Sequence, residues 1–70
     1  MTLKWTDVDE IGYALSEKFP DIAPLAVRFT ELRKRVMELE AFSDDPAASS
    51  EKVLEAIQMA WLEYYSESRQ

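Results

Sequence analysis

Apolar residues recur at helical spacing in three separate segments of this 70-residue chain, and proline-containing segments separate them. Such spacing predicts amphipathic helices, each with one face turned toward a shared core. A chain of this length buries only a modest core, so its stability is expected to be about 3–5 kcal/mol. The pattern therefore predicts an all-α fold, a small three-helix bundle with little or no sheet, as a single domain over residues 1–70.

Each apolar stripe follows a residue type that commonly caps helices. The first stripe follows Thr6 and should end by Phe19, because a proline comes next. The second follows Thr30, and the third follows Ser49 or Ser50. The residues expected to face the core are Val8, Ile11, Leu15 and Phe19, then Leu32, Val36 and Leu39, then Val53, Ile57, Ala60, Trp61 and Tyr64.

The chain contains neither cysteine nor histidine. Their absence excludes disulfides, thiolate metal sites, cysteine nucleophiles and imidazole ligands. The single glycine, Gly12, leaves no glycine-rich loop that could hold a phosphate. The chemical groups that remain are carboxylates, tyrosines and lysines, and a domain this small offers little pocket, so no catalytic residue is predicted.

The charge of the chain is negative and unevenly distributed. Fourteen acidic and eight basic residues give a net charge of −6, with +3 in residues 28–35 and −9 in the remainder. Such a surface repels phosphates and attracts cations or basic protein surfaces. No apolar run near the N-terminus resembles a signal peptide and none reaches membrane-spanning length, so a cytoplasmic protein without a membrane partner is expected.

Two pairs of carboxylates are candidate ligands for a metal ion. Asp7 and Glu10 stand three residues apart at the start of the first predicted helix, and Asp44 and Asp45 share a loop. Carboxylate oxygens are hard ligands that suit Mg²⁺, Ca²⁺, Mn²⁺ and iron ions. Sites as exposed as these would bind loosely and weakly. The alternative is an ordinary solvated acidic surface.

The outer face of the third predicted helix is a candidate surface for a protein partner. Glu51, Glu55 and Leu62 could meet a basic partner there, with Met59 as an adaptable apolar contact. The alternative is that these residues have no binding role, because scattered apolar residues are normal on any protein surface. We place Trp61 in the core, whereas the competing interpretation makes it an exposed anchor for a partner.

Arg33, Lys34 and Arg35 form a basic segment in the middle predicted helix. Three basic residues could contact nucleic acid, but a net charge of −6 makes phosphate binding weak, so no nucleic-acid partner is predicted. The alternative is a solvated face on which these residues pair with Glu31 and Glu38.

A series of short stretches runs in order from Leu3 to about Glu63. The stretches are Leu3-Lys4-Trp5-Thr6-Asp7, Glu10-Ile11-Gly12, Ala14-Leu15, Pro20-Asp21, Pro24, Val27-Arg28-Phe29-Thr30, Leu39-Glu40, Phe42, Asp44-Asp45-Pro46, Ala48-Ser49, Glu51-Lys52, Leu54-Glu55-Ala56-Ile57 and Trp61-Leu62. Together, in this order and spacing, they resemble the IscX family, small acidic proteins of bacterial iron–sulfur cluster assembly. Residues 64–70 form a tail outside the resemblance.

The resemblance implies a modified winged-helix fold and no catalytic activity. It implies weak binding of iron ions by surface carboxylates, with no cluster ligated by this chain. It also implies binding to cysteine desulfurase, in competition with the frataxin homologue and ferredoxin. The leading hypothesis is therefore a monomeric, iron-binding adaptor or regulator of that enzyme. The alternatives are a protein-interaction module without a metal role and a winged-helix DNA-binding domain.

Overall fold

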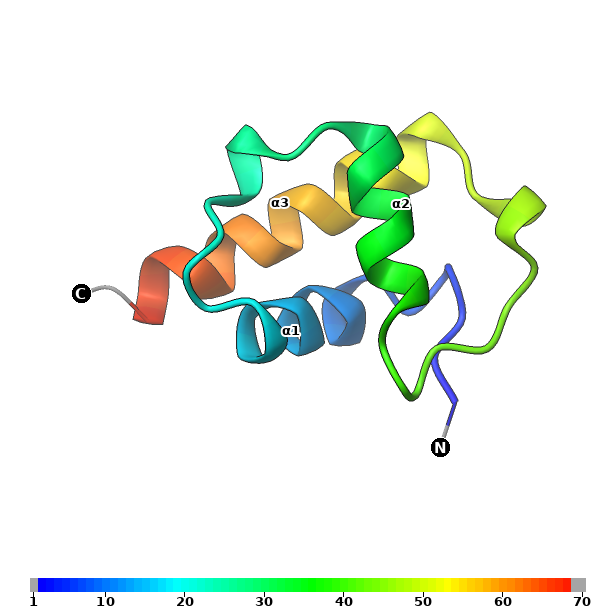
Figure 1. The fold of residues 1–70 in the computed structure, drawn as a ribbon, viewed down its shortest axis with the longest axis horizontal. Helices are drawn as coiled ribbons and strands as arrows, with labels where there is room; N and C mark the ends of the chain where they lie inside the picture. Colours follow the sequence, from blue (N-terminus) through cyan, green and yellow to red (C-terminus); the bar gives the residue numbers. More distant parts are fainter. Residues whose placement is uncertain (1, 69–70) are drawn as a thin grey trace.

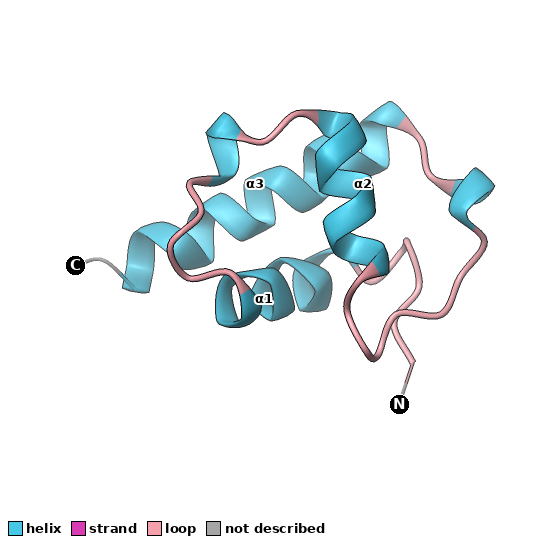
Figure 2. Cartoon of the chain, viewed as in Figure 1, coloured by secondary structure: helices cyan, strands magenta, loops and turns pink. Residues whose placement is uncertain are grey.

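The computed structural model describes residues 2–68 and contains three α-helices and two short 3₁₀ turns (Figure 1). In chain order, the elements are α1 (Val8–Lys18), η1 (Pro24–Ala26), α2 (Phe29–Met37), η2 (Pro46–Ala48) and α3 (Glu51–Ser68). No strand forms within the described residues (Figure 2), and an isolated parallel bridge joins Leu3 to Phe42. The prediction of a small all-α domain with three helices and little or no sheet is confirmed.

The longest helix, α3, packs along α1, and α2 crosses both of them (Figure 1). The fully buried apolar side chains between the helices are Ile11, Leu15, Leu32, Val36, Ile57 and Trp61. All six lie on the predicted stripes, while Leu54 joins the core without having been predicted. Within residues 2–68, none of the helices combines the length and hydropathy needed to cross a membrane.

The N-terminal boundaries of the first two helices differ from the predicted ones. Asp7, rather than Thr6, is the N-cap of α1, and α2 begins at Phe29, before the predicted cap Thr30. Phe29, the first residue of α2, packs against the core, and no side chain caps that helix. At the start of α3, Ser50 accepts a hydrogen bond from the backbone N–H three residues later, as predicted.

Gly12 lies where α1 meets α3. A Cβ atom built on Gly12 would lie 2.7 Å from the Cβ of Ala60 and 2.8 Å from the backbone nitrogen of Trp61. Such distances are shorter than side chains tolerate in a packed interior. The two helices can therefore approach this closely only because residue 12 has no side chain.

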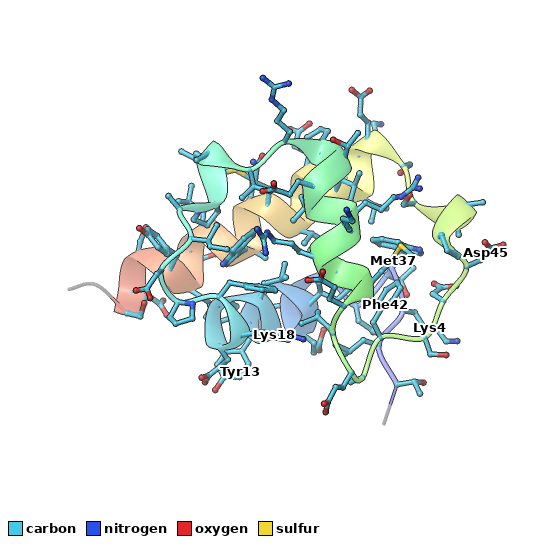
Figure 3. All side chains as sticks on the ribbon, in the orientation of Figure 1. Lys4, Tyr13, Lys18, Met37, Phe42 and Asp45 are labelled. Carbon is cyan, nitrogen blue, oxygen red and sulfur yellow. The ribbon has the colours of Figure 1, made fainter. Side chains whose placement is uncertain are left out.

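The N-terminal segment is attached to the loop that follows α2. Leu3 exchanges backbone hydrogen bonds of 2.7 and 3.0 Å with residues 41–43. Trp5 is buried against the same loop. Its indole N–H donates to the backbone oxygen of Asp45 at 2.7 Å, and its ring contacts the ring of Phe42 edge to face. Figure 3 shows Phe42 and Asp45 at the end of the molecule that carries the N-terminus.

Candidate functional site

The four predicted metal ligands lie in segments that the fold connects. Asp7 is the N-cap of α1 and Glu10 lies in its first turn, while Asp44 and Asp45 directly precede η2. Consecutive backbone N–H groups of residues 4–5 donate to Asp7 at 2.8 Å and to Asp44 at 3.0 Å. The N-terminal segment thus connects the two pairs, although their sequence positions are far apart.

Three of these four carboxylates already accept backbone hydrogen bonds. Asp44 accepts from the N–H groups of Trp5 and Asp45, and the carboxylate of Asp45 accepts from Ala47 at 3.0 Å. The N–H of Trp5, followed by that of Asp45, lowers the pKa of Asp44 below its ordinary value of 3.8. Each carboxylate oxygen has two lone pairs, so these bonds leave acceptor capacity for a cation.

Lys4 places a positive charge beside the same loop. Its ammonium group donates to the backbone oxygen of Ser43 at 2.8 Å, and its charge helps to lower the pKa of Asp44. In the part of the chain that the structure describes, no group of three or more acidic side chains could hold a metal ion. A cation bound here would retain most of its water ligands and would compete with the ammonium group.

The predicted protein-binding residues lie on the side of α3 that faces away from the core. Glu51 and Glu55 are exposed, and Met59 is 55% exposed. Leu62 is half-buried. A shallow groove runs along this face, where Met59 and Leu62 lie beside the small side chain of Ala56. The structure thus presents an apolar patch next to two glutamates.

Two glutamates that the sequence analysis left unassigned extend this face. Glu63 and Glu67 are exposed and continue the four-residue spacing of Glu51, Glu55 and Met59. Side chains four residues apart are neighbours on a helix surface, so these five residues form one row, the α3 acidic row, which winds around the helix by about 40° at each step. Within residues 2–68, no basic nitrogen lies within 4.0 Å of its glutamate oxygens. The row thus carries exposed glutamates that the described basic residues leave unpaired.

The basic segment on α2 is partly used in packing. The guanidinium of Arg35 lies 4.8 Å from the ring centre of Phe19 and 3.6 Å from the carboxylate of Glu31. This confirms the predicted pairing with Glu31 for one member of the segment. Arg33 and Lys34 are exposed.

Comparisons with known proteins agree with the resemblance found in the sequence. A family model described as "Iron-sulphur cluster assembly" matches residues 3–66, which include α1, α2 and all but the last two residues of α3. An uncharacterised protein from Pseudomonas aeruginosa is 59% identical over 63 residues, which cover 90% of this chain and 96% of that protein.

Proposed function

Since the chain belongs to the IscX family of iron–sulfur cluster assembly, we propose that it acts in the cytoplasm as an adaptor or regulator that binds cysteine desulfurase. The observation that carries this proposal is the α3 acidic row, with four exposed glutamates around Met59. The row combines glutamates that form no ion pair with residues 2–68 and an adaptable apolar contact, which suits a basic protein surface that has an apolar centre.

The physical role of the row is to attract and orient the partner. Single exposed ion pairs contribute about 0–1 kcal/mol each, so no one glutamate is expected to dominate the affinity. Several charges of one sign along one helix act together on the encounter, and salt screens their effect. Affinity for the desulfurase should therefore fall clearly between low and physiological ionic strength.

Calorimetric titration with purified cysteine desulfurase tests the proposal. The double variant Glu55→Lys, Glu63→Lys reverses two charges of the row and should weaken binding by about tenfold or more at low salt. The control Glu38→Lys, Glu40→Lys reverses the same number of charges on exposed residues after α2 and should have a much smaller effect. Equal affinities for the double variant and the control, or an affinity independent of salt, would contradict the role of the row.

We also propose that the protein carries iron weakly, as cargo held by oxygen ligands, with Asp7, Glu10, Asp44 and Asp45 as the candidate ligands. The support is their connection through the N-terminal segment and the acceptor capacity that their hydrogen bonds leave free. The neighbouring ammonium of Lys4 should keep the affinity low, because it repels a cation at the same loop.

Anaerobic calorimetry and paramagnetic NMR with Fe²⁺ test the iron proposal. Amide signals near the four carboxylates should broaden, and Lys4→Gln should strengthen binding more than the control Lys18→Gln. Both lysines donate to a backbone oxygen, but Lys18 bonds at the end of α2, to Glu38. Binding that survives neutralisation of all four carboxylates would show that other ligands hold the iron. No binding at all would favour an interaction module without a metal role.

A further inference from the structure

A groove of about 470 Å³ lies between the C-terminal part of α1 and the C-terminal end of α3. It is lined by Tyr13, Ser16, Glu17, Pro20, Tyr64, Glu67 and Ser68. None of these residues is basic, and two of them are acidic. The aromatic residues of the groove, Tyr13 and Tyr64, take no part in the α3 acidic row, so the proposed function leaves this aromatic part of the groove unexplained.

Two tyrosine rings form an aromatic wall of the groove. The rings of Tyr13 and Tyr64 meet edge to face, with centroids 5.4 Å apart and an interplanar angle of 78°. Tyr13 is 51% exposed, and Tyr64 is half-buried. The face of an aromatic ring carries partial negative charge, so an accessible pair of this kind attracts cations.

Carboxylates surround the two phenol groups. The hydroxyl of Tyr64 donates to Asp9 at 2.9 Å, which raises the pKa of that phenol. Glu17 raises the pKa of Tyr13, first by a hydrogen bond and then by its charge. Both phenols therefore stay neutral at physiological pH, with carboxylate side chains beside them.

Among residues 2–68, the basic residue nearest to the groove in sequence does not neutralise these carboxylates. Lys18 follows Glu17 directly, but its ammonium donates to the backbone oxygen of Glu38 at 2.9 Å and lies 5.9 Å from the ring centre of Phe19. It is therefore turned toward the end of α2 and is not among the residues that line the groove.

We propose that this groove binds an arginine side chain of a protein partner, stacked on the Tyr13–Tyr64 pair and hydrogen-bonded to Glu17 or Glu67. A guanidinium group is planar, weakly hydrated and rich in N–H donors, so it can lie on a ring and donate to a carboxylate at the same time. A lysine ammonium is a strongly hydrated point charge and fits such a site less well. Charge complementarity selects this occupant, and the inference does not depend on which protein supplies it.

The test uses the capped peptide acetyl-Gly-Arg-Gly-amide, which is titrated into the full-length protein. The ring signals of the protein's tyrosines are followed by NMR. The signals of Tyr13 and Tyr64 should shift in a saturable manner. A peptide with citrulline in place of arginine, which keeps the shape without the charge, should cause no comparable shift. Equal responses to the two peptides would overturn the proposal.

Variants separate a specific site from general attraction to a negative chain. Tyr13→Leu and Glu17→Gln should each weaken binding of the arginine peptide by about threefold or more, the size expected for one exposed cation–π or ion-pair contact. Glu40→Gln removes one charge in the turn after α2 and should leave the affinity nearly unchanged. Unchanged affinity in a Tyr13→Leu variant that keeps its helical circular dichroism would contradict the proposal.

A second copy of this chain is the competing occupant, because Arg33 on α2 is exposed. Sedimentation velocity over a range of protein concentrations distinguishes it from another protein. The proposal expects no self-association through the groove. Self-association that disappears in both Arg33→Gln and Tyr13→Leu would show that the groove holds another copy, and would overturn the assignment to a different protein.

Discussion

Replacing Gly12 with alanine puts a methyl group against the backbone of α3. The added Cβ would lie 2.7 Å from the Cβ of Ala60, 2.8 Å from the nitrogen of Trp61 and 2.9 Å from the carbonyl carbon of Ala60. Two of these three atoms belong to the backbone, so they cannot move aside by a side-chain rotation. The helices must separate by at least about 0.7 Å before all three contacts reach ordinary van der Waals distance.

The expected effect is the difference between two opposing contributions. Overpacking a filled interior typically costs about 1–3 kcal/mol, and the rigid contacts here place Gly12→Ala toward the upper end. Alanine in the middle of a helix recovers about 1 kcal/mol relative to glycine. We therefore expect a net loss of about 1–2 kcal/mol, a large part of the stability of so small a domain. The melting temperature should fall by about 5–15 °C.

Urea unfolding followed by tryptophan fluorescence measures this loss, because Trp5 and Trp61 are both buried. Ala56→Gly on the exposed face of α3 is the control that reports helix propensity alone. Adding Ala60→Gly to Gly12→Ala removes the contact with the Cβ of Ala60 and should recover part of the loss, seen as non-additivity in a double-mutant cycle. A Gly12→Ala variant as stable as the parent protein, or more stable, would refute the close-approach argument.

Two further predictions concern the core and the N-terminal attachment. Trp61→Ala should be largely unfolded at room temperature by circular dichroism, because truncating a buried tryptophan typically costs about 3–5 kcal/mol. A variant that stays folded and loses only its affinity for the partner would show that Trp61 is a docking residue instead. The folded-state pKa of Asp44 is depressed, so its stabilising effect is present above about pH 4 and is lost as the pH falls through that lower pKa. Asp44→Asn should therefore be less stable than the parent at neutral pH, and the difference between their urea midpoints should shrink in acid. A difference that stays constant at all pH values would show that the ionised carboxylate of Asp44 does not stabilise the fold.

The composition of the core could be predicted because helical spacing decides which side chains share a face. Spacing alone assigns Ile11, Leu32 and Trp61 to the core, and the structure buries each of them completely. Helix starts were harder to predict. Thr6 and Asp7 are both favoured cap residues, so residue type does not choose between them, and α2 begins at Phe29 without any side-chain cap. The role of Gly12 could not be predicted from its own segment, because the close approach of α3 is what makes a Cβ atom unfavourable there.

The candidate sites could be predicted only in part. Residue type and loop composition indicate Asp44 as a possible metal ligand, but not that the backbone of Trp5, 39 residues away in sequence, donates to it. The four-residue spacing of Glu63 and Glu67 is visible in the sequence. Which side of the last helix remains uncovered depends on the packing of α1, η1 and α2 against it, so the full length of the α3 acidic row emerges only from the fold.

The central claim is that the α3 acidic row docks cysteine desulfurase, and an NMR footprint tests it most directly. Amide signals of the isotope-labelled protein are recorded while unlabelled desulfurase is added. We predict that signals at Glu55, Met59 and Glu63 weaken first, that Glu40 is little affected, and that the double variant Glu55→Lys, Glu63→Lys largely loses the footprint. A footprint centred on Arg33 and its neighbours in α2, with the outer face of α3 unchanged, would contradict the claim.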